Sequence, residues 1–218
     1  MIDNVLFDLD GTLADTAPDL ANALNAIRQK HNLEKLPLEV ISPTVSLGGN
    51  AMIKLAFDLE EGESGFDEIR EQFLNYYLEH IAEETRLYDG METLLSSLED
   101  NNKTWGIVTN KSGWLTIPLL EALSLDKRTA CVVCGDTLEQ RKPHPAPILH
   151  ACELIQAEPA ATIYIGDAQR DIEAGNRAGT KTMVALYGYI EKNEAPESWN
   201  ADAMVSSVDE INDVISKL

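Results

Sequence analysis

Short uninterrupted apolar runs recur along this chain of 218 residues and alternate with segments of helical spacing. Runs that are apolar at every position are typical of strands buried on both faces of a parallel sheet. The pattern predicts strands at 4–7, 105–108, 131–134, 163–165, 182–186 and, more weakly, 203–205. It predicts helices at 91–98, 115–123, 145–155, 172–178 and 209–218. Strands that alternate with helices indicate an α/β fold with a doubly wound, Rossmann-like parallel sheet.

Residues 15–85 break this alternation, because they show helical stripes and no convincing strand. The pattern therefore predicts a core domain of residues 1–14 and 86–218 and a small all-helical cap of residues 15–85, inserted directly after the first strand. Ligands of open parallel sheets bind beyond the carboxyl ends of the strands, so an insert at this point would cover the site as a lid.

Local motifs in and beside this insert carry further predictions. We expect Thr16 to cap the first helix of the insert, with Asp19 at the third helical position completing a box-like start. The segment Ser46-Leu-Gly-Gly-Asn50 predicts a flexible turn between helices. Arg86 lies at the expected hinge, where we expect a structural ion pair.

Composition narrows the class of protein. Hydrophobic residues make up 44% of the chain, which predicts a packed core, and the formal net charge is −20. No basic stripe offsets this charge, so we expect no nucleic-acid binding and no binding to an anionic membrane surface. An anionic substrate must then be attracted by local cations.

The three cysteines and the N-terminal segment bear on location. The chain has only three cysteines, Cys131, Cys134 and Cys152, and this small, odd number predicts reduced thiols. Cys131-Val-Val-Cys134 lies in an apolar run, so we expect buried structural residues there and no zinc or redox site. An apolar strand begins within four residues of Met1 without a basic leader, and no stretch is long enough to span a bilayer. We expect a cytoplasmic protein, either a monomer or a homodimer.

The first strand ends in two aspartates, Asp8 and Asp10, which are followed by Gly11 and Thr12. A carboxylate is ionised at neutral pH, so Asp8 is a candidate nucleophile that needs no activating base. Strand alternation places Asp10 on the same side, where it can carry a proton to a leaving alcohol and from a water. Gly11 and Thr12 are expected to turn the chain and to offer backbone N–H groups to a phosphate.

Polar residues also follow the later strands. Thr109 and Asn110 are candidate phosphate donors, and Lys142 can neutralise charge shared by Asp8 and a phosphate. Asp167 is a candidate metal ligand, and Asp171 could bind the metal through water or orient Lys142. An all-oxygen site rich in carboxylates favours Mg²⁺. Together these residues predict hydrolysis of a phosphate ester through an aspartyl phosphate.

The same residues resemble the motifs of the haloacid dehalogenase-like superfamily over the whole chain. Asp8-Leu-Asp10-Gly-Thr12 is similar to its first motif, Thr109 to its second, Lys142 to its third, and Gly166-Asp167 with Asp171 to its fourth. The resemblance implies a helical cap and Mg²⁺ bound by the side chains of Asp8 and Asp167 and by the backbone carbonyl of Asp10. The dehalogenase branch lacks the second aspartate, so Asp10 argues for phosphoester chemistry.

A finer resemblance concerns the substrate. Asp15-Thr-Ala-Pro18, Val108-Thr-Asn-Lys111 and Lys142-Pro-His-Pro145 resemble the phosphoglycolate phosphatase group. Tyr187-Gly-Tyr-Ile190 and the segment around Trp199 are similar to bacterial N-acetylmuramic acid 6-phosphate phosphatases. The resemblance implies a small phosphorylated metabolite as substrate, with a slight preference for the sugar phosphate because of the Trp199 segment.

Two alternatives remain open, a phosphomutase of the same superfamily and a phosphate-ligand binding protein without turnover. The intact pair of Asp8 and Asp10 argues against mere binding. We expect Trp199 to cover a hydrophobic surface and Tyr187 and Tyr189 to flank a strand end. The sequence leaves open whether these three rings touch a substrate. Lys111 is expected to add positive potential beside the phosphate donors.

Overall fold

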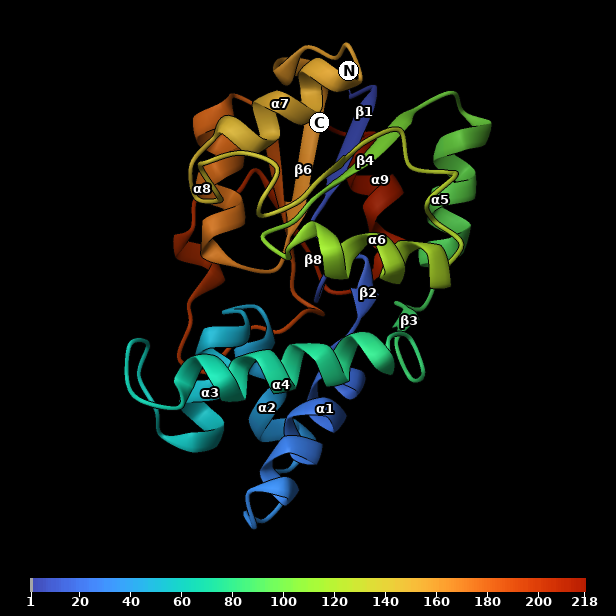
Figure 1. The fold of residues 1–218 in the computed structure, drawn as a ribbon. Coiled ribbons are helices and arrows are strands. Elements are labelled where there is room, and N and C mark those ends of the chain that lie inside the picture. The colour runs from blue at the N-terminus through green and yellow to red at the C-terminus, as the bar shows by residue number, and fades with distance from the viewer. Residues whose placement is uncertain (1) are drawn as a thin grey trace.

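The computed structural model describes residues 2–218 and has a six-stranded parallel sheet at its centre (Figure 1). The strands lie in the order β5–β4–β1–β6–β7–β8. Their bounds are β1 (Asn4–Phe7), β4 (Thr104–Val108), β5 (Val132–Val133), β6 (Thr162–Gly166), β7 (Lys181–Ala185) and β8 (Ala203–Val205). All six apolar runs are therefore strands, although β5 is shorter than its run.

The register of the central strands fixes where their polar ends lie. Phe7 of β1 is opposite Ile107 of β4 and Ile165 of β6. The chain moves from β1 outward through β4 and β5, and then returns to the other side of β1 through β6, β7 and β8. The winding thus reverses at β1, and the residues that follow β1, β4 and β6 meet at one edge, where ligands of such sheets bind.

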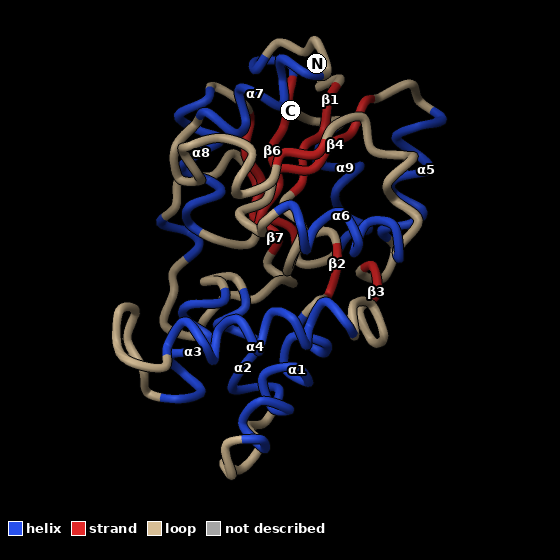
Figure 2. The backbone as a smooth tube through the Cα atoms, viewed as in Figure 1, coloured by secondary structure: helices blue, strands red, loops and turns tan. Residues whose placement is uncertain are grey.

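Helices cover both faces of this sheet, as the continuous apolar runs predict (Figure 2). Val5 and Phe7 pack into a cluster with side chains of α5 (Met91–Asp100), α6 (Gly113–Ala122) and α9 (Ile211–Ile215). Leu6 points the other way, into a cluster with α7 (Ala146–Leu154) and α8 (Gln169–Ala178). The fold is the predicted doubly wound α/β arrangement.

The last helix is shorter than the sequence pattern predicts. The structure has a 3₁₀ turn at Val208–Glu210 and then only α9, instead of a helix over 209–218. Asn212, Asp213 and Ser216 are weak helix formers, since their side chains compete for backbone hydrogen bonds. Ser216 shows this competition directly, because its hydroxyl donates to the carbonyl of Asp213.

The segment between β1 and α5 forms a separate layer of four helices beyond the carboxyl ends of the strands (Figure 1). We refer to α1 to α4 as the cap. Its helices are α1 (Ala17–Lys30), α2 (Leu38–Val45), α3 (Gly49–Phe57) and α4 (Phe66–Glu79). Their apolar faces pack on one another in a cluster that includes Leu24, Ile53 and Phe73. The cap helices therefore share one hydrophobic cluster, which also includes Leu115 of α6 and Tyr189.

A two-stranded antiparallel ribbon, which the sequence pattern does not predict, joins the cap to the core. It pairs β2 (Ala14–Asp15) with β3 (Arg86–Leu87). Two residues are too few to show a periodic pattern. The guanidinium of Arg86 donates to the backbone carbonyls of Glu83 and Thr85 and forms no ion pair with any of residues 2–218, so the predicted ion pair is wrong.

The predicted capping box at the start of α1 is also wrong. The hydroxyl of Thr16 donates to Asp10 Oδ1 at 2.6 Å instead of to the helix backbone. Asp19 is 3% exposed and accepts hydrogen bonds from the backbone N–H groups of Glu84 and Thr85 and from the hydroxyl of Thr85. Asp19 thus ties the first cap helix to the segment that returns to the core.

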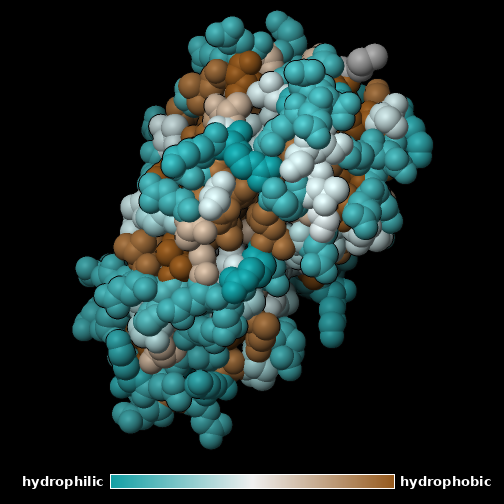
Figure 3. Space-filling model, turned by 90° about the vertical axis from the view of Figure 1, so that its right-hand side faces the viewer, coloured by the Kyte–Doolittle hydropathy of each residue, from teal (hydrophilic) through white to brown (hydrophobic). Residues whose placement is uncertain are grey.

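Acidic residues lie mostly at the surface. Within residues 2–218 four acidic residues are buried, and these are Asp8, Asp19, Asp167 and Asp171. On the face shown in Figure 3, hydrophilic residues cover most of the surface and hydrophobic residues reach it in separate patches. The three cysteines are free and buried. None of the helices within residues 2–218 combines the length and apolar character needed to cross a bilayer.

We expect Asp19→Ala to lower the free energy of unfolding by about 1–3 kcal/mol, because it leaves the backbone N–H and the hydroxyl of the buried Thr85 without their acceptor. Urea unfolding of both proteins measures this difference. Glu71→Ala, an exposed acid on α4, is the control and should have little effect. Equal stability of Asp19→Ala and Glu71→Ala would contradict the role assigned to Asp19.

Candidate active site

Asp8 follows β1 directly and is 3% exposed. Its backbone N–H donates to the carbonyl of Ile165 at 2.8 Å, which continues the pairing of β1 with β6. Its Oδ1 accepts a hydrogen bond from the backbone N–H of Leu9 at 2.8 Å and lies 2.9 Å from Lys142 Nζ. The sheet therefore positions this carboxylate at the centre of the edge where the strands end.

Lys142 is the cation that compensates this buried charge. Its ammonium group is fully buried and lies 2.8 Å from Asp171 Oδ1 as well as 2.9 Å from Asp8. It also donates to the carbonyl of Val108 at 3.0 Å and lies 2.8 Å from the hydroxyl of Tyr164. The prediction that Asp171 orients Lys142 agrees with this geometry.

Asn110 holds the backbone of Lys142. Its Nδ2 donates to the Lys142 carbonyl at 3.0 Å, and its Oδ1 accepts from the Lys142 N–H at 3.1 Å. These two bonds fix the orientation of the Asn110 side-chain amide and use one of its two Nδ2 hydrogens. Asn110 also lines the cavity beside Asp8. Thr109, which precedes it at the end of β4, is buried and lines the cavity that Asp8 also lines.

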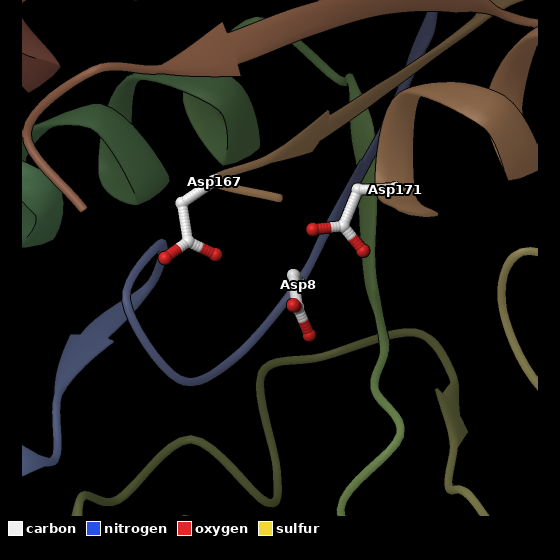
Figure 4. Close-up of side chains that lie close together, drawn as sticks. All are labelled: Asp8, Asp167 and Asp171. Atoms are coloured by element: carbon white, nitrogen blue, oxygen red, sulfur yellow. The ribbon is translucent and has the colours of Figure 1, made fainter. Parts of the chain in front are cut away.

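Three carboxylates lie close together: Asp8 after β1, Asp167 after β6 and Asp171 on α8 (Figure 4). Two of them, Asp8 and Asp171, contact Lys142. One oxygen of each lies within 4.8 Å of the other two, and all three residues are buried. Burial, partly offset by Lys142 and reinforced by Asp171, raises the pKa of Asp8 to about 6. Burial, reinforced by Asp171 and Asp8, raises the pKa of Asp167 to about 7. This donor set suits a hard cation such as Mg²⁺, whose charge would offset the mutual repulsion of these acids.

Asp10 is outside this cluster and has its own partners. Its Oδ1 accepts from Thr16 at 2.6 Å and lies 3.0 Å from Lys111 Nζ. Lys111 Nζ in turn lies 4.7 Å from the centre of the Tyr77 ring, on cap helix α4. Burial acts to lower the pKa of Lys111, but the charge of Asp10 and the hydroxyl of Tyr77 outweigh it, and the pKa is raised. Lys111 therefore stays charged beside Asp10.

Gly11 and Thr12 turn the chain, as predicted, but their backbone N–H groups face other partners than expected. Their backbone N–H groups donate to the carbonyls of Ala14 and Leu9 within the turn, and neither residue lines the cavity. The expectation that these two N–H groups face a phosphate is not supported. Gly11 has φ +82°, and a Cβ at this position would lie 2.1 Å from Asp167 Oδ2. A glycine is required there because the turn runs against the carboxylate of Asp167.

Asp167 connects the core to the cap. Its Oδ2 accepts from the hydroxyl of Ser46 at 2.9 Å and from the backbone N–H of Tyr189 at 2.8 Å. Ser46 begins the glycine-containing turn between α2 and α3. A cap side chain thus reaches one of the three clustered acids, a contact that the sequence pattern does not indicate.

The aromatic residues after β7 brace this arrangement. The Tyr189 hydroxyl donates to Asp15 Oδ1 at 2.6 Å and accepts from the Ala17 N–H at 2.8 Å. The Tyr187 hydroxyl donates to the Thr12 carbonyl at 3.0 Å. Trp199 packs against Ile172 and Val184, as expected of a residue covering a hydrophobic surface. None of these three rings lines the cavity beside Asp8.

A cavity of about 320 Å³ lies between core and cap and opens onto Asp8, Asp10 and Thr109. Three arginines that the sequence pattern does not indicate also line it: Arg70 of α4, Arg141 before Lys142, and Arg170 of α8. The Nε of Arg170 is buried and has no hydrogen-bond partner among residues 2–218. The only sequence feature that could have indicated a role for Arg170 is its position directly before Asp171.

Comparison with known proteins indicates one family of hydrolases. The family described as haloacid dehalogenase-like hydrolase matches residues 5–185. The chain is 38% identical over 211 residues to an N-acetylmuramic acid 6-phosphate phosphatase of Pseudomonas putida, covering 97% of this chain and 95% of that protein. It is 39% identical to a phosphoglycolate phosphatase of Xanthomonas campestris pv. campestris, covering 92% and 90%. A crystal structure of a predicted phosphoglycolate phosphatase from Haemophilus somnus superimposes with a TM-score of 0.87 at 28% identity, covering 98% and 97%.

We expect Gly11→Ala to destabilise the protein by more than Gly62→Ala. Both glycines have a positive φ, and a side chain at Gly62 would meet nothing within 4 Å. Backbone strain alone is worth about 1–3 kcal/mol, and the overlap with Asp167 should add about 1–3 kcal/mol at Gly11. Chemical unfolding of the two variants measures the difference, and equal losses would mean that the contact with Asp167 is unimportant.

Proposed function

The chain belongs to the haloacid dehalogenase-like hydrolase family, and we propose that it is a Mg²⁺-dependent phosphatase of small phosphate monoesters that works through an aspartyl phosphate. One observation carries this proposal: the buried Asp8 carboxylate faces the cavity while Lys142 compensates its charge at 2.9 Å. A buried carboxylate that only stabilised the fold would not need to open onto a cavity. The names of the relatives support the same activity.

In the first step a carboxylate oxygen of Asp8 attacks phosphorus and the bond from phosphorus to the leaving alcohol breaks. Asp10 transfers a proton to the departing oxygen. In the second step Asp10 takes a proton from a water that attacks the phosphoryl group, and Asp8 is regenerated. Asp10 lines the same cavity as Asp8, which supports this shared role. Arg170 adds one positive charge beside the acids, where a phosphoryl group would arrive.

The metal would be held by the side chains of Asp8 and Asp167 and by the backbone carbonyl of Asp10. When bound, Mg²⁺ supplies positive charge that offsets the repulsion between the acids and the phosphoryl oxygens. Asp171 is engaged with Lys142 at 2.8 Å and accepts from the N–H of Ala168 at 3.0 Å. Its part is therefore to hold Lys142 beside Asp8.

The proposed substrate is N-acetylmuramic acid 6-phosphate or 2-phosphoglycolate. Because Trp199 packs in a hydrophobic cluster away from the cavity, its segment no longer argues for the sugar. The volume of about 320 Å³ instead favours the sugar, since it is within the range of small-molecule pockets and larger than a two-carbon acid requires. The relative from Pseudomonas putida supports the same choice.

Phosphate release from p-nitrophenyl phosphate tests the activity. We expect Asp8→Asn to abolish turnover and Asp10→Asn to lower kcat by about 10²–10⁴, because the first loses the nucleophile and the second the proton carrier. Thermal unfolding verifies that both variants are folded. A phosphomutase would instead release an isomerised sugar phosphate and no free phosphate, and turnover that survives Asp8→Asn would contradict the nucleophile assignment.

Mg²⁺ should stabilise the folded protein in a pH-dependent way. The pKa values of Asp8 and Asp167 in the folded protein, about 6 and about 7, are above the ordinary value of 3.8. Without metal, the stability contributed by their protonated forms is complete below about pH 4 and is lost as pH rises toward about 7. Mg²⁺ offsets that loss, so about 10 mM Mg²⁺ should raise the melting temperature more at about pH 8 than at about pH 5.

The Asp167→Asn variant is the control for this experiment, since it keeps the shape of the side chain and removes its charge. We expect its Mg²⁺-induced shift to be smaller and to depend less on pH. An unchanged shift in Asp167→Asn would show that the ion binds elsewhere.

A further inference from the structure

The cavity is a positive region in a negative protein. The chain carries 37 acidic and 17 basic residues, yet two acids and four cations line the cavity. The acids are Asp8 and Asp10, and the cations are Arg70, Lys111, Arg141 and Arg170. Four cations around one cavity of an acidic protein indicate a ligand that carries more negative charge than a single phosphoryl group beside Asp8.

These cations lie on different sides of the cavity. Lys111 is paired with Asp10, and Arg170 lies beside the clustered acids. Arg70 is on α4 of the cap, on the side away from the strands. Of the four cations it is the one carried by the cap, where it would meet the leaving group of a bound substrate rather than its phosphate.

Arg70 is held in place by other cap residues. Its Nε donates to Asn50 Oδ1 at 2.7 Å, and Asn50 Nδ2 donates to Glu61 Oε2 at 2.9 Å. The two terminal nitrogens of Arg70 form no hydrogen bond or ion pair with any of residues 2–218. The side chain is thus fixed through Nε while its planar fork stays available.

Apolar side chains surround this end of the cavity. Phe73 and Leu74 follow Arg70 on the same face of α4, and Leu20 of α1 and Met52 of α3 complete the wall. All four are buried. An ion pair formed among such side chains is stronger than one in water, and the apolar wall can pack against the carbon frame of a substrate.

We propose that Arg70 forms a second anion subsite, which binds a carboxylate on the leaving group of the substrate. This inference rests on the proposed phosphatase function and specifies its substrate class: phosphate monoesters whose alcohol portion carries a carboxylate. The planar guanidinium fork matches the two oxygens of a carboxylate and balances its single charge. A second phosphate shares the anionic character but carries more charge than Arg70 neutralises.

The test compares matched substrates that differ in one anionic group. N-acetylmuramic acid 6-phosphate is paired with N-acetylglucosamine 6-phosphate, which lacks the carboxylate-bearing ether. 2-phosphoglycolate is paired with 2-hydroxyethyl phosphate, and a sugar bisphosphate provides the arm with a second phosphate. The values of kcat/KM are measured for the wild-type protein, Arg70→Gln and Arg177→Gln. Arg177 is an exposed arginine that does not line the cavity, so its variant controls for the lost charge.

We expect the wild-type protein to prefer at least one carboxylate substrate over its neutral partner by about 10- to 100-fold, the usual effect of a hydrogen-bonded charge pair. Arg70→Gln should remove most of this preference by raising KM for the carboxylate substrate more than for its partner. Arg177→Gln should keep the preference.

Three results would overturn the subsite. The first is that Arg70→Gln lowers kcat/KM equally for both members of each pair, as loss of a structural residue would. The second is that the wild-type protein prefers the bisphosphate to the carboxylates. Failure of the proposed function is distinct, because a wild-type protein that is no phosphatase releases no phosphate from p-nitrophenyl phosphate either. The third result, a protein that hydrolyses this ester but does not discriminate within the pairs, contradicts the subsite alone.

Discussion

The buried ammonium group of Lys142 is the interaction on which the rest of the structure depends. Asp8, which follows β1, and Asp171 of α8 both lie within 3 Å of it. Removing Lys142 would leave two carboxylates in the interior without this cation, which is far more costly than the loss of a surface ion pair. The ends of β1, β4 and β6 are thereby fixed around one point, with Asn110 and Tyr164 fixing the lysine itself.

The same constraint extends to the cap. Asp167 accepts from Ser46 of the cap, and Asp10 accepts from Thr16 at the start of α1. Tyr189 donates through its backbone N–H to Asp167 and through its hydroxyl to Asp15 of β2. Each of these contacts joins an acid of the site to the cap or to its attachment. The environment of the acids therefore depends on the position of the cap, because displacing α1 or the Ser46 turn would remove hydrogen bonds from their charged oxygens.

Much of the sheet and half of the site could be predicted from the sequence, for definite physical reasons. A strand buried on both faces must be apolar throughout, so β1, β4 and β6 are visible as runs, and Asp8, Thr109 and Asp167 stand out where those runs end. The hinge strands β2 and β3 are two residues long and show no period. Arg70, Arg170 and the Thr16–Asp10 hydrogen bond depend on which helix faces share the cavity. That is a property of tertiary packing, and local spacing does not carry it.

A net charge of −20 and an anionic substrate are compatible because the two act over different distances. Charges on the surface are screened beyond about 8 Å at physiological ionic strength, whereas cations in a cavity lie in direct contact with a ligand, in a medium of lower dielectric constant. The arginines of the cavity therefore outweigh a larger number of remote carboxylates. They are also separated, with Arg170 beside the clustered acids and Arg70 on the cap. Such a separation favours a ligand with two anionic ends over inorganic phosphate, which has one, so that charge placement within the cavity can provide the selectivity that overall charge cannot.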